Sequence, residues 1–282
     1  PATSARISVV MPCYNAAPFV REAVECVMGQ TRGDVELIVV DDGSTDASRD
    51  LLHALAAAHG PRMRVLHQDR KGPYPARNLG LRHASGGLVA FLDADDYLSP
   101  DCLDKLANAL ERTDADIAYC GWQNVGEGAP GTTPYVPPDY AALDTAAEFL
   151  RACPWPIHAA LVRRAAIDAV GGFSERCFSA MDYDLWLRIS EIGKIENIAQ
   201  DLLLYRRHAS QVSASGNAHR QTIYSVGAAT DHFLKKYGFT RIECRIDETI
   251  SDDIAEKLML IYGAPPAVAD RAALNRHCIR LL

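Results

Sequence analysis

The fold is decided by residues 6–59, RISVVMPCYNAAPFVREAVECVMGQTRGDVELIVVDDGSTDASRDLLHALAAAH. Two apolar runs, Arg6 to Met11 and Val35 to Val40, alternate with two stretches of helical periodicity, Pro18 to Gln30 and Thr45 to His59. The apolar runs show little polar alternation, which predicts strands buried on both faces in a mostly parallel sheet covered by helices. This β-α-β-α order predicts a doubly wound α/β sheet with helices on both faces.

The same alternation continues to about residue 120. Residues 126–140 are rich in Gly and Pro and predict a loop. After His219 the pattern is helical to the end of the chain, which predicts a C-terminal helical appendage. The remaining predicted elements of the first part are strands at Met63 to His67, Leu88 to Leu92 and Asp116 to Cys120, and a helix at Pro100 to Arg112.

Composition argues against several classes of protein. The 282 residues include 29 basic and 36 acidic side chains, and a net charge of −7 argues against a nucleic-acid partner. The longest apolar runs have five residues, far below the ~20 that a membrane-spanning helix needs. Because the first residues lack a hydrophobic signal segment, we expect a cytoplasmic protein.

Polar and acidic residues gather where the predicted strands end. The first strand is followed by Pro12-Cys13-Tyr14-Asn15, the second by Asp41-Asp42-Gly43-Ser44, and the fourth by Asp93-Ala94-Asp95-Asp96. Ligands of open α/β sheets bind outside the carboxyl ends of the strands, so we expect these residues to share one site. Crowded carboxylates repel one another unless a cation or a ligand compensates their charge.

The acidic run after the fourth strand indicates a cation and a nucleotide. In an extended stretch, side chains two residues apart point the same way, so we expect Asp93 and Asp95 to face one ligand. Carboxylate oxygens suit Mg²⁺ or Mn²⁺, which keep other coordination positions for water and substrate phosphates. The alternative is a capped turn before the helix at Pro100, for which Asp96 or Ser99 would suffice.

Three blocks, VVMPCYNAAPFVREAVECVMGQT, ELIVVDDGSTD and ARNLGLRHASGGLVAFLDADD, occur in this order in the chain. Together they resemble the signature of inverting glycosyltransferase family 2, and the likeness covers roughly residues 6–213. The resemblance implies a GT-A fold and a nucleotide-sugar donor bound across the ends of the strands.

The resemblance assigns roles on the nucleotide side. Asp42 matches the carboxylate that contacts uracil, a role that suits it because a carboxylate can accept the N3–H of the base. Pro12 and Tyr14 would flank that base. Arg77 matches a position beside the nucleotide, and its alternative is a surface arginine on the helix that starts at Tyr74.

The resemblance also implies a metal site that holds Mn²⁺ or Mg²⁺. Asp93 would face the ribose, Asp95 would hold the metal, and Asp96 would lie close to the metal or the donor sugar. Tyr205-Arg206-Arg207-His208 resembles the family's Y-R-x-H stretch, in which the histidine supplies an imidazole ligand. Arg206 or its neighbour Arg207 would pair with the diphosphate of the donor.

The segment GGFSERCFSAMDYDLWLR, from Gly171 to Arg188, resembles the family's GGF…ED-x-DLWLR segment. The resemblance makes Asp182 the general base, which takes the proton of the acceptor hydroxyl as that oxygen attacks the anomeric carbon. Asp182 also has the character of an N-cap for a helix from Tyr183 to Ile192. Met181 stands where the family usually has Glu, a departure that bears on the acceptor-side contacts.

The predicted function is therefore that of a metal-dependent inverting glycosyltransferase. It would move a sugar from a nucleotide-sugar donor, with UDP favoured over dTDP, to a hydroxyl of a carbohydrate, lipid-linked or small-molecule acceptor. The alternatives are a sugar nucleotidyltransferase, which typically carries a Gly-rich basic loop after its first strand, and a nucleotide- or glycan-binding module without catalysis.

The predicted domain organisation follows the same reading of the sequence. We expect a GT-A catalytic domain at 1–218, with the nucleotide-sugar half at about 1–120 and the acceptor half at about 121–218. Residues 219–282 would form the helical region, whose apolar positions would serve as its core or as a homodimer contact. A lipid-linked acceptor would place the protein peripherally at the inner face of a membrane.

Overall fold

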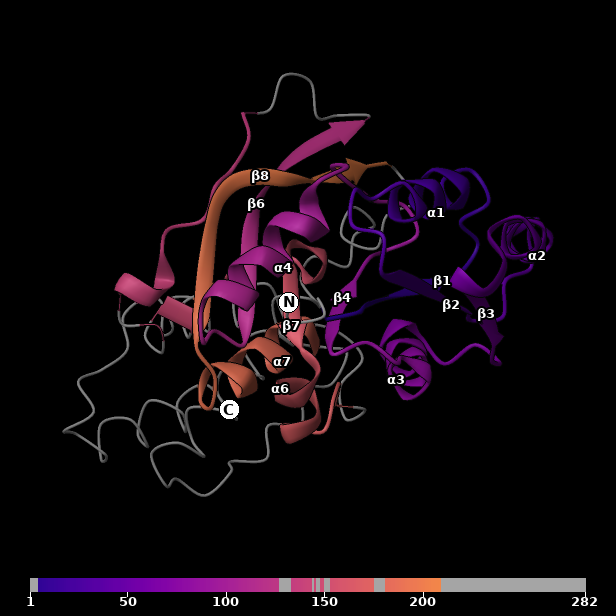
Figure 1. Ribbon diagram of the computed structural model, residues 1–282. Helices are drawn as coiled ribbons and strands as arrows, with labels where there is room; N and C mark the ends of the chain where they lie inside the picture. Colours follow the sequence, from indigo (N-terminus) through magenta and orange to yellow (C-terminus); the bar gives the residue numbers. More distant parts are fainter. Residues whose placement is uncertain are drawn as a thin grey trace, which may run out of the picture.

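The computed structural model describes residues 5–126, 133–143, 145, 148–149, 153–174 and 181–208. The predicted helical region 219–282, with its homodimer contact, lies outside these residues. Among the described residues, the strands form one eight-stranded sheet with helices on both of its faces (Figure 1). The strand order is β3 (Met63–His67), β2 (Val35–Asp41), β1 (Ile7–Cys13), β4 (Leu88–Phe91), β7 (Ala160–Arg163), β6 (Ile117–Gly126), β8 (Ile195–Arg207) and β5 (Tyr97–Leu98). None of the described helices is long and apolar enough to cross a bilayer.

The first half of the sheet has the predicted α/β alternation. Its parallel strands are buried almost throughout, except for the outer strand β3. Figure 1 shows α1 and α2 on one face of these strands and α3 on the other, so the double winding is confirmed here. The elements are β1 (Ile7–Cys13), α1 (Val20–Met28), β2 (Val35–Asp41), α2 (Ser48–His59), β3 (Met63–His67), α3 (Pro73–His83) and β4 (Leu88–Phe91).

The second half of the sheet is mixed rather than mostly parallel. β7 runs antiparallel to both of its neighbours, β4 and β6, and β5 runs antiparallel to β8. β6 and β8 are parallel, with register shifts on either side of Gly121. The elements are β5 (Tyr97–Leu98), α4 (Cys102–Arg112), β6 (Ile117–Gly126), β7 (Ala160–Arg163), α6 (Arg164–Ala169), α7 (Met181–Ser190) and β8 (Ile195–Arg207).

Three short 3₁₀ turns complete the described elements: η1 (Gly60–Arg62), η2 (Tyr140–Ala142) and η3 (Ile157–Ala159). The last of them leads directly into β7. Because β7 pairs with β4, this turn lies close to the carboxyl end of β4. The contact partners of the η3 residue His158, given below, confirm that closeness.

Strand register brings the predicted site residues to one edge of the sheet. Cys13 at the end of β1 pairs with Asp41 at the end of β2, and the Asp42 N–H donates to the Cys13 carbonyl at 2.8 Å. Beyond β4, the Leu92 N–H still donates to the Val10 carbonyl, and the chain leaves the sheet there. The long strand β8 bends in Figure 1 and ends near α1 and the top of β4.

Helix α3 packs unusually close to β1, because a glycine stands at the crossing. A Cβ atom added at Gly80 would lie 2.4 Å from Val10 Cγ1. The close approach fixes the position of α3, which carries Tyr74 and Arg77 near its N-terminal end.

Candidate active site

The acidic run after β4 forms a turn, not an extended stretch. The Asp96 N–H donates to the Asp93 carbonyl at 3.1 Å. The extended conformation from which this pairing was predicted is therefore absent, and Asp93 and Asp95 have different protein partners, Arg77 and His208. The three acidic side chains of the turn still lie close enough for Asp93 to raise the pKa of both Asp95 and Asp96.

Asp95 and His208, the two predicted metal ligands, are in direct contact. His208 Nε2 lies 2.9 Å from Asp95 Oδ2, and the His208 ring packs on Phe19 with a centroid distance of 4.5 Å. Burial and repulsion from Asp93 raise the pKa of Asp95, and His208 partly offsets the rise. A carboxylate oxygen and an imidazole nitrogen that converge in this way fit a Mn²⁺ ion.

The side chain of Asp96, the last residue of the turn, is buried and binds the backbone at the end of β8. Its side chain is 1% exposed, and its Oδ1 accepts the backbone N–H of Arg206 at 2.6 Å. Burial, reinforced by the neighbouring aspartates, raises the pKa of Asp96 well above its ordinary value. In this conformation the carboxylate supports the protein rather than facing a donor sugar.

The guanidinium of Arg206 contacts protein groups on two sides. Its Nε donates to the Asp95 carbonyl at 2.7 Å, and its terminal nitrogen pairs with Glu22 of α1. The same guanidinium lies 5.0 Å from the ring centroid of Tyr97. Arg206 therefore borders the predicted metal pair, and contact with a diphosphate would require it to leave Glu22.

Arg77 is a buried residue of the site. It is 4% exposed, so the surface alternative is wrong, and its terminal nitrogen makes a close ion pair with Asp93 Oδ1. Its guanidinium lies 5.3 Å from the ring centroid of Tyr74 and 5.8 Å from that of Phe173. Arg77 thus joins α3 to the acidic turn.

Asp182, the predicted base, is the second residue of α7 and is half-buried. Its Oδ1 accepts the N–H of Tyr183 at 2.9 Å. Burial raises the pKa of Asp182, the Tyr183 N–H and the charge of Arg77 lower it, and Asp93 raises it further. Asp182, Arg77 and Asp93 therefore act on one another electrostatically, and the net effect favours a carboxylate that accepts a proton more readily than an ordinary aspartate.

The nucleotide side of the site is built around Asp42. Its Oδ1 accepts hydrogen bonds from Gln68 Nε2 at 2.7 Å and the Lys71 N–H at 2.8 Å, and its Oδ2 accepts from the Gly72 N–H at 2.8 Å. The carboxylate thus fixes the backbone of the 68–72 segment. Because three hydrogen bonds already reach it, it can accept few further ones. Lys71 and Gln68 also line a hollow of about 540 Å³ at this place.

Tyr14 and Pro12 border the same region at the end of β1. Tyr14 is 38% exposed, and the Arg70 guanidinium lies 3.4 Å above its ring centroid. Pro12 is half-buried and pairs in register with Val40 of β2. Tyr14 therefore lies beside the 68–72 segment, and one face of its ring is covered by a cation.

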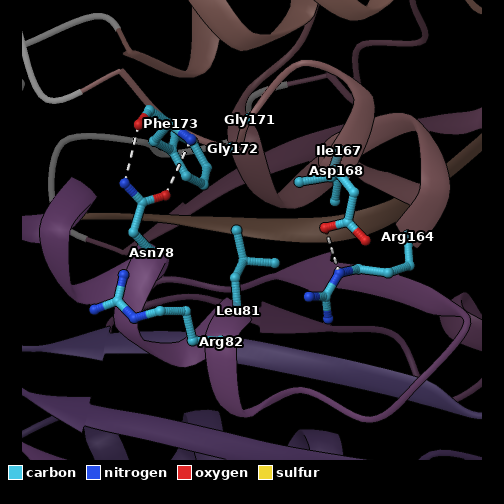
Figure 2. Close-up of a pocket in the computed structure, with 9 residues that line it drawn as sticks. All are labelled: Asn78, Leu81, Arg82, Arg164, Ile167, Asp168, Gly171, Gly172 and Phe173. Atoms are coloured by element: carbon cyan, nitrogen blue, oxygen red, sulfur yellow. Dashed lines mark hydrogen bonds and ion pairs between the residues drawn. The ribbon is translucent and has the colours of Figure 1, made fainter.

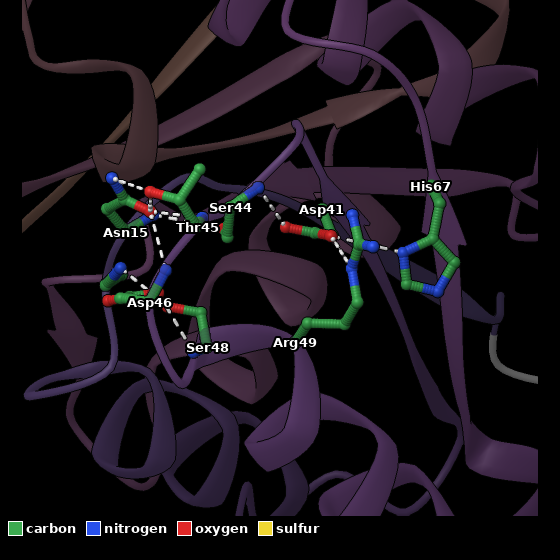
Figure 3. A network of polar contacts seen from close by, with 9 residues as sticks. Asn15, Asp41, Ser44, Thr45, Asp46, Ser48, Arg49 and His67 are labelled. Carbon is green, nitrogen blue, oxygen red and sulfur yellow. Dashed lines mark hydrogen bonds and ion pairs between the residues drawn. The ribbon is translucent and has the colours of Figure 1, made fainter.

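Asp41, next to Asp42, is a structural carboxylate. Figure 3 shows it facing Arg49 and His67, with Asp41 Oδ2 at 2.9 Å from Arg49 Nε and 3.2 Å from His67 Nδ1. Its Oδ1 accepts the Ser44 N–H at 3.0 Å. Burial raises the pKa of Asp41, but the contacts with Ser44, Arg49 and His67 outweigh it, so the pKa lies below its ordinary value.

A hollow of about 500 Å³ lies between α3 and α6, and no residue of the acidic turn lines it (Figure 2). At one end the side chain of Asn78 donates to the Phe173 carbonyl at 2.9 Å and accepts the Phe173 N–H at 3.0 Å. This pair of bonds fixes the Gly171–Phe173 turn to α3. Arg82 and Arg164 border the same hollow.

His158, which the sequence did not predict as a site residue, lies between two of the predicted aspartates. Its Nε2 is 3.4 Å from Asp96 Oδ2, and its Nδ1 is 3.9 Å from Asp93 Oδ2. Burial lowers the pKa of His158 to about 4 despite the charge of Asp93, so the ring is neutral at physiological pH. His158 lies 62 residues beyond Asp96 and belongs to no recognisable motif. The one sequence feature that could have indicated it is its position directly before an apolar run at 159–162.

Comparison with known proteins agrees with this arrangement. The family model for glycosyl transferase family 2 matches residues 8–171. The uncharacterized glycosyltransferase EpsJ of Bacillus subtilis is 35% identical over 136 residues, which are 48% of this chain and 38% of EpsJ. Chondroitin synthase of Escherichia coli is 33% identical over 199 residues, which are 68% of this chain and 27% of the synthase. The chain thus spans less than half the length of these relatives.

Two solved structures show the same fold. S. aureus TarS in complex with UDP-GlcNAc has a TM-score of 0.67 at 18% identity, over 91% of this chain and 71% of TarS. The mannosyltransferase PcManGT from Pyrobaculum calidifontis, in complex with GDP-Man and Mn²⁺, has a TM-score of 0.61 at 20% identity, over 99% of this chain and 81% of the mannosyltransferase. These likenesses confirm the predicted GT-A fold. The family model also covers more than half of the residues of this chain. The chain therefore belongs to glycosyltransferase family 2.

Proposed function

We propose that the chain catalyses inverting transfer of a sugar from a nucleotide-sugar donor to an acceptor hydroxyl, with Asp182 as the general base. The observation that carries this proposal is the link made by Arg77 between the acidic turn and α7. Arg77 pairs with Asp93 and lowers the pKa of Asp182 through its charge. A proton acceptor and a group on the donor side are thereby coupled electrostatically to one buried cation.

In this proposal, Asp182 acts on the acceptor, and Asp93 and Arg77 act on the donor side. Asp182 takes the proton of the acceptor hydroxyl as its oxygen attacks the anomeric carbon from the face opposite the leaving diphosphate. Burial supports this role because it raises the pKa of Asp182. Asp93 and Arg77 keep the donor-side turn in place, and Asp93 Oδ1 is the oxygen that Arg77 holds.

We assign the diphosphate-side metal to Asp95 and His208, and their atoms fit a divalent cation. The two side chains are partly exposed, at 24% and 13%, so an ion between them would still be open to a donor. When bound, Mn²⁺ or Mg²⁺ would offset the charge that develops on the leaving diphosphate. The imidazole ligand favours Mn²⁺, because Mg²⁺ prefers oxygen ligands.

For the donor we propose UDP, with dTDP as the close alternative, because both bases present an N3–H to Asp42. Tyr14 and Pro12 would flank the base, with Arg70 already on one face of the Tyr14 ring. Arg206 would reach the diphosphate on leaving Glu22. The nucleotide-sugar half would cover about residues 1–120 and the acceptor half about 121–218, with a carbohydrate, lipid-linked or small-molecule acceptor.

Incubation with a panel of UDP- and dTDP-sugars, Mn²⁺ and an acceptor mixture tests this function. We expect release of the nucleoside diphosphate and a new glycoside whose anomeric configuration, followed by NMR, is opposite to that of the donor. A product of retained configuration would contradict the inverting mechanism. Pyrophosphate-dependent formation of UTP would indicate a nucleotidyltransferase, and binding without release of the diphosphate would indicate a binding module.

A further inference from the structure

The inner side of the acidic turn carries a second group of potential ligands, apart from Asp95 and His208. One oxygen of Asp93, one oxygen of Asp96 and one ring nitrogen of His158 all lie within 4.8 Å of one another. The three residues come from the turn after β4 and from η3, just before β7. Strand pairing between β4 and β7 therefore fixes how far apart they lie.

The environment of His158 indicates that this group of side chains binds a ligand. Its side chain is 1% exposed, and neither ring nitrogen has a hydrogen-bond partner among the described residues. The ring stacks on Tyr205 of β8 at a centroid distance of 5.2 Å and an interplanar angle of 21°, which fixes its plane. A buried imidazole without hydrogen bonds is costly, so a ligand that takes its lone pair would remove part of that cost.

Each of the two carboxylates has one oxygen held by the protein and a second that faces the histidine. Asp93 Oδ1 pairs with Arg77, while Oδ2 lies on the side of His158 Nδ1. Asp96 Oδ1 accepts the Arg206 N–H, while Oδ2 lies on the side of His158 Nε2. Second partners of this kind orient the ligands of metal sites in proteins.

The spacing of the Asp96–His158 pair suits a small divalent ion, and Asp93 Oδ2, which lies 3.9 Å from the other ring nitrogen, would have to move toward that ion to complete the ligand set. Tetrahedral bonds of about 2.0 Å separate neighbouring ligand atoms by about 3.3 Å, and Asp96 Oδ2 lies 3.4 Å from His158 Nε2. In the part of the chain that the structure describes, His158 is the one basic side chain within ion-pair distance of Asp96. A bound cation would therefore favour the ionised form of this buried carboxyl group.

We propose that Asp93, Asp96 and His158 form a second divalent-cation site, which fills without nucleotide and is distinct from the Asp95–His208 pair. The mixed oxygen and nitrogen ligands select Mn²⁺ or Zn²⁺ over Mg²⁺. The ion ties β7 and η3 to the acidic turn and so holds Asp93 for the donor. Asp93 remains able to accept a hydrogen bond from a ribose hydroxyl, because a carboxylate has more than two acceptor positions.

Crystals of the full chain soaked in MnCl₂ without nucleotide provide the first test. We expect an anomalous peak between Asp96 Oδ2, Asp93 Oδ2 and the His158 ring. A saturating Mn²⁺ soak that leaves this position without a peak, with or without an ion at Asp95 and His208, would overturn the proposal. This test uses the unaltered chain, so it does not depend on the folding of any variant.

Titration in solution supplies the second test, with Mn²⁺ alone and its EPR signal as the readout. His158→Gln should weaken nucleotide-free binding at this site by more than the ~10-fold that follows loss of an outer-shell partner. His208→Gln should leave that binding intact, and His83→Gln, at an exposed position of α3, is the matched control. Equal Mn²⁺ affinity of the His158→Gln variant and the unaltered chain would reject the site. Since no nucleotide is present, that failure would leave the proposed sugar transfer untouched.

Discussion

His208 Nε2 lies 2.9 Å from Asp95 Oδ2, a contact between residues 113 positions apart that joins the end of β8 to the turn after β4. The two atoms that contact each other are also the two that would bind a metal. The contact therefore keeps the two proposed ligand atoms close together, and a divalent ion that binds both atoms would take the place of their hydrogen bond.

We predict that His208→Ala raises the Mn²⁺ concentration required for half-maximal transfer by about tenfold or more, because one ligand is lost. The rate at saturating Mn²⁺ should fall less than the apparent affinity. A titration of transfer rate against Mn²⁺ measures both quantities, with His83→Ala on the exposed side of α3 as the control. An unchanged titration would remove His208 from the ligand set.

The pH dependence of transfer should report Asp182. Burial raises the pKa of this carboxyl above its ordinary value of 3.8, and transfer requires the deprotonated form. The rate should therefore increase with pH along an acidic limb that lies above pH 3.8. Arg77 lowers the pKa of Asp182, so Arg77→Met should shift the limb to higher pH. Arg82→Met, at an exposed position of the same helix, is the control, and a limb that stays in place in Arg77→Met would contradict the electrostatic link.

The contact of Asn78 with Phe173 should contribute strongly to stability. Asn78→Ala leaves a buried N–H and a carbonyl of Phe173 without partners, so the free energy of unfolding should fall by about 2–4 kcal/mol. Urea denaturation measures the change. Asn108→Ala removes a single half-buried hydrogen bond, to Asp104, and should cost less. Similar losses in the two variants would show that the Gly171–Phe173 turn is held by other contacts.

Asp41 should make stability depend on pH in the acidic range. Its pKa lies below the ordinary value of 3.8, so its contribution is present above pH 3.8 and is lost as the pH falls through the lower folded value. The difference in unfolding free energy between the unaltered chain and Asp41→Asn should therefore shrink on acidification. Asp50→Asn, at an exposed position of α2, is the control. A difference that stays constant between neutral and acidic pH would contradict this account.

The sequence patterns predicted most of the first half of the fold. β1 and β2 are apolar along their length because both faces are covered, and that burial is what their composition indicates. β7 escaped prediction because four residues, Ala160–Arg163, are too few to show a period.

Only some of the site residues could be predicted, because several of their contacts depend on tertiary packing. The contact of Asp95 with His208 follows from the family resemblance, since nothing local in the sequence connects residues so far apart. The burial of Arg77 and Asp96 depends on packing by α3 and β8, which a motif does not show. His158 belongs to no motif, and only the pairing of β7 with β4 brings it to the acidic turn.

If Asp182 removes the acceptor proton while other residues hold the donor, Asp182→Asn should slow the chemical step and spare donor binding. We predict a fall of about 10²- to 10⁴-fold in kcat for transfer, with the Kd for UDP and Mn²⁺, measured by calorimetry, unchanged. Asp168→Asn, an exposed carboxylate of α6, should change neither quantity. Loss of UDP binding in Asp182→Asn, or transfer at the unaltered rate, would contradict the assignment of Asp182 as the base.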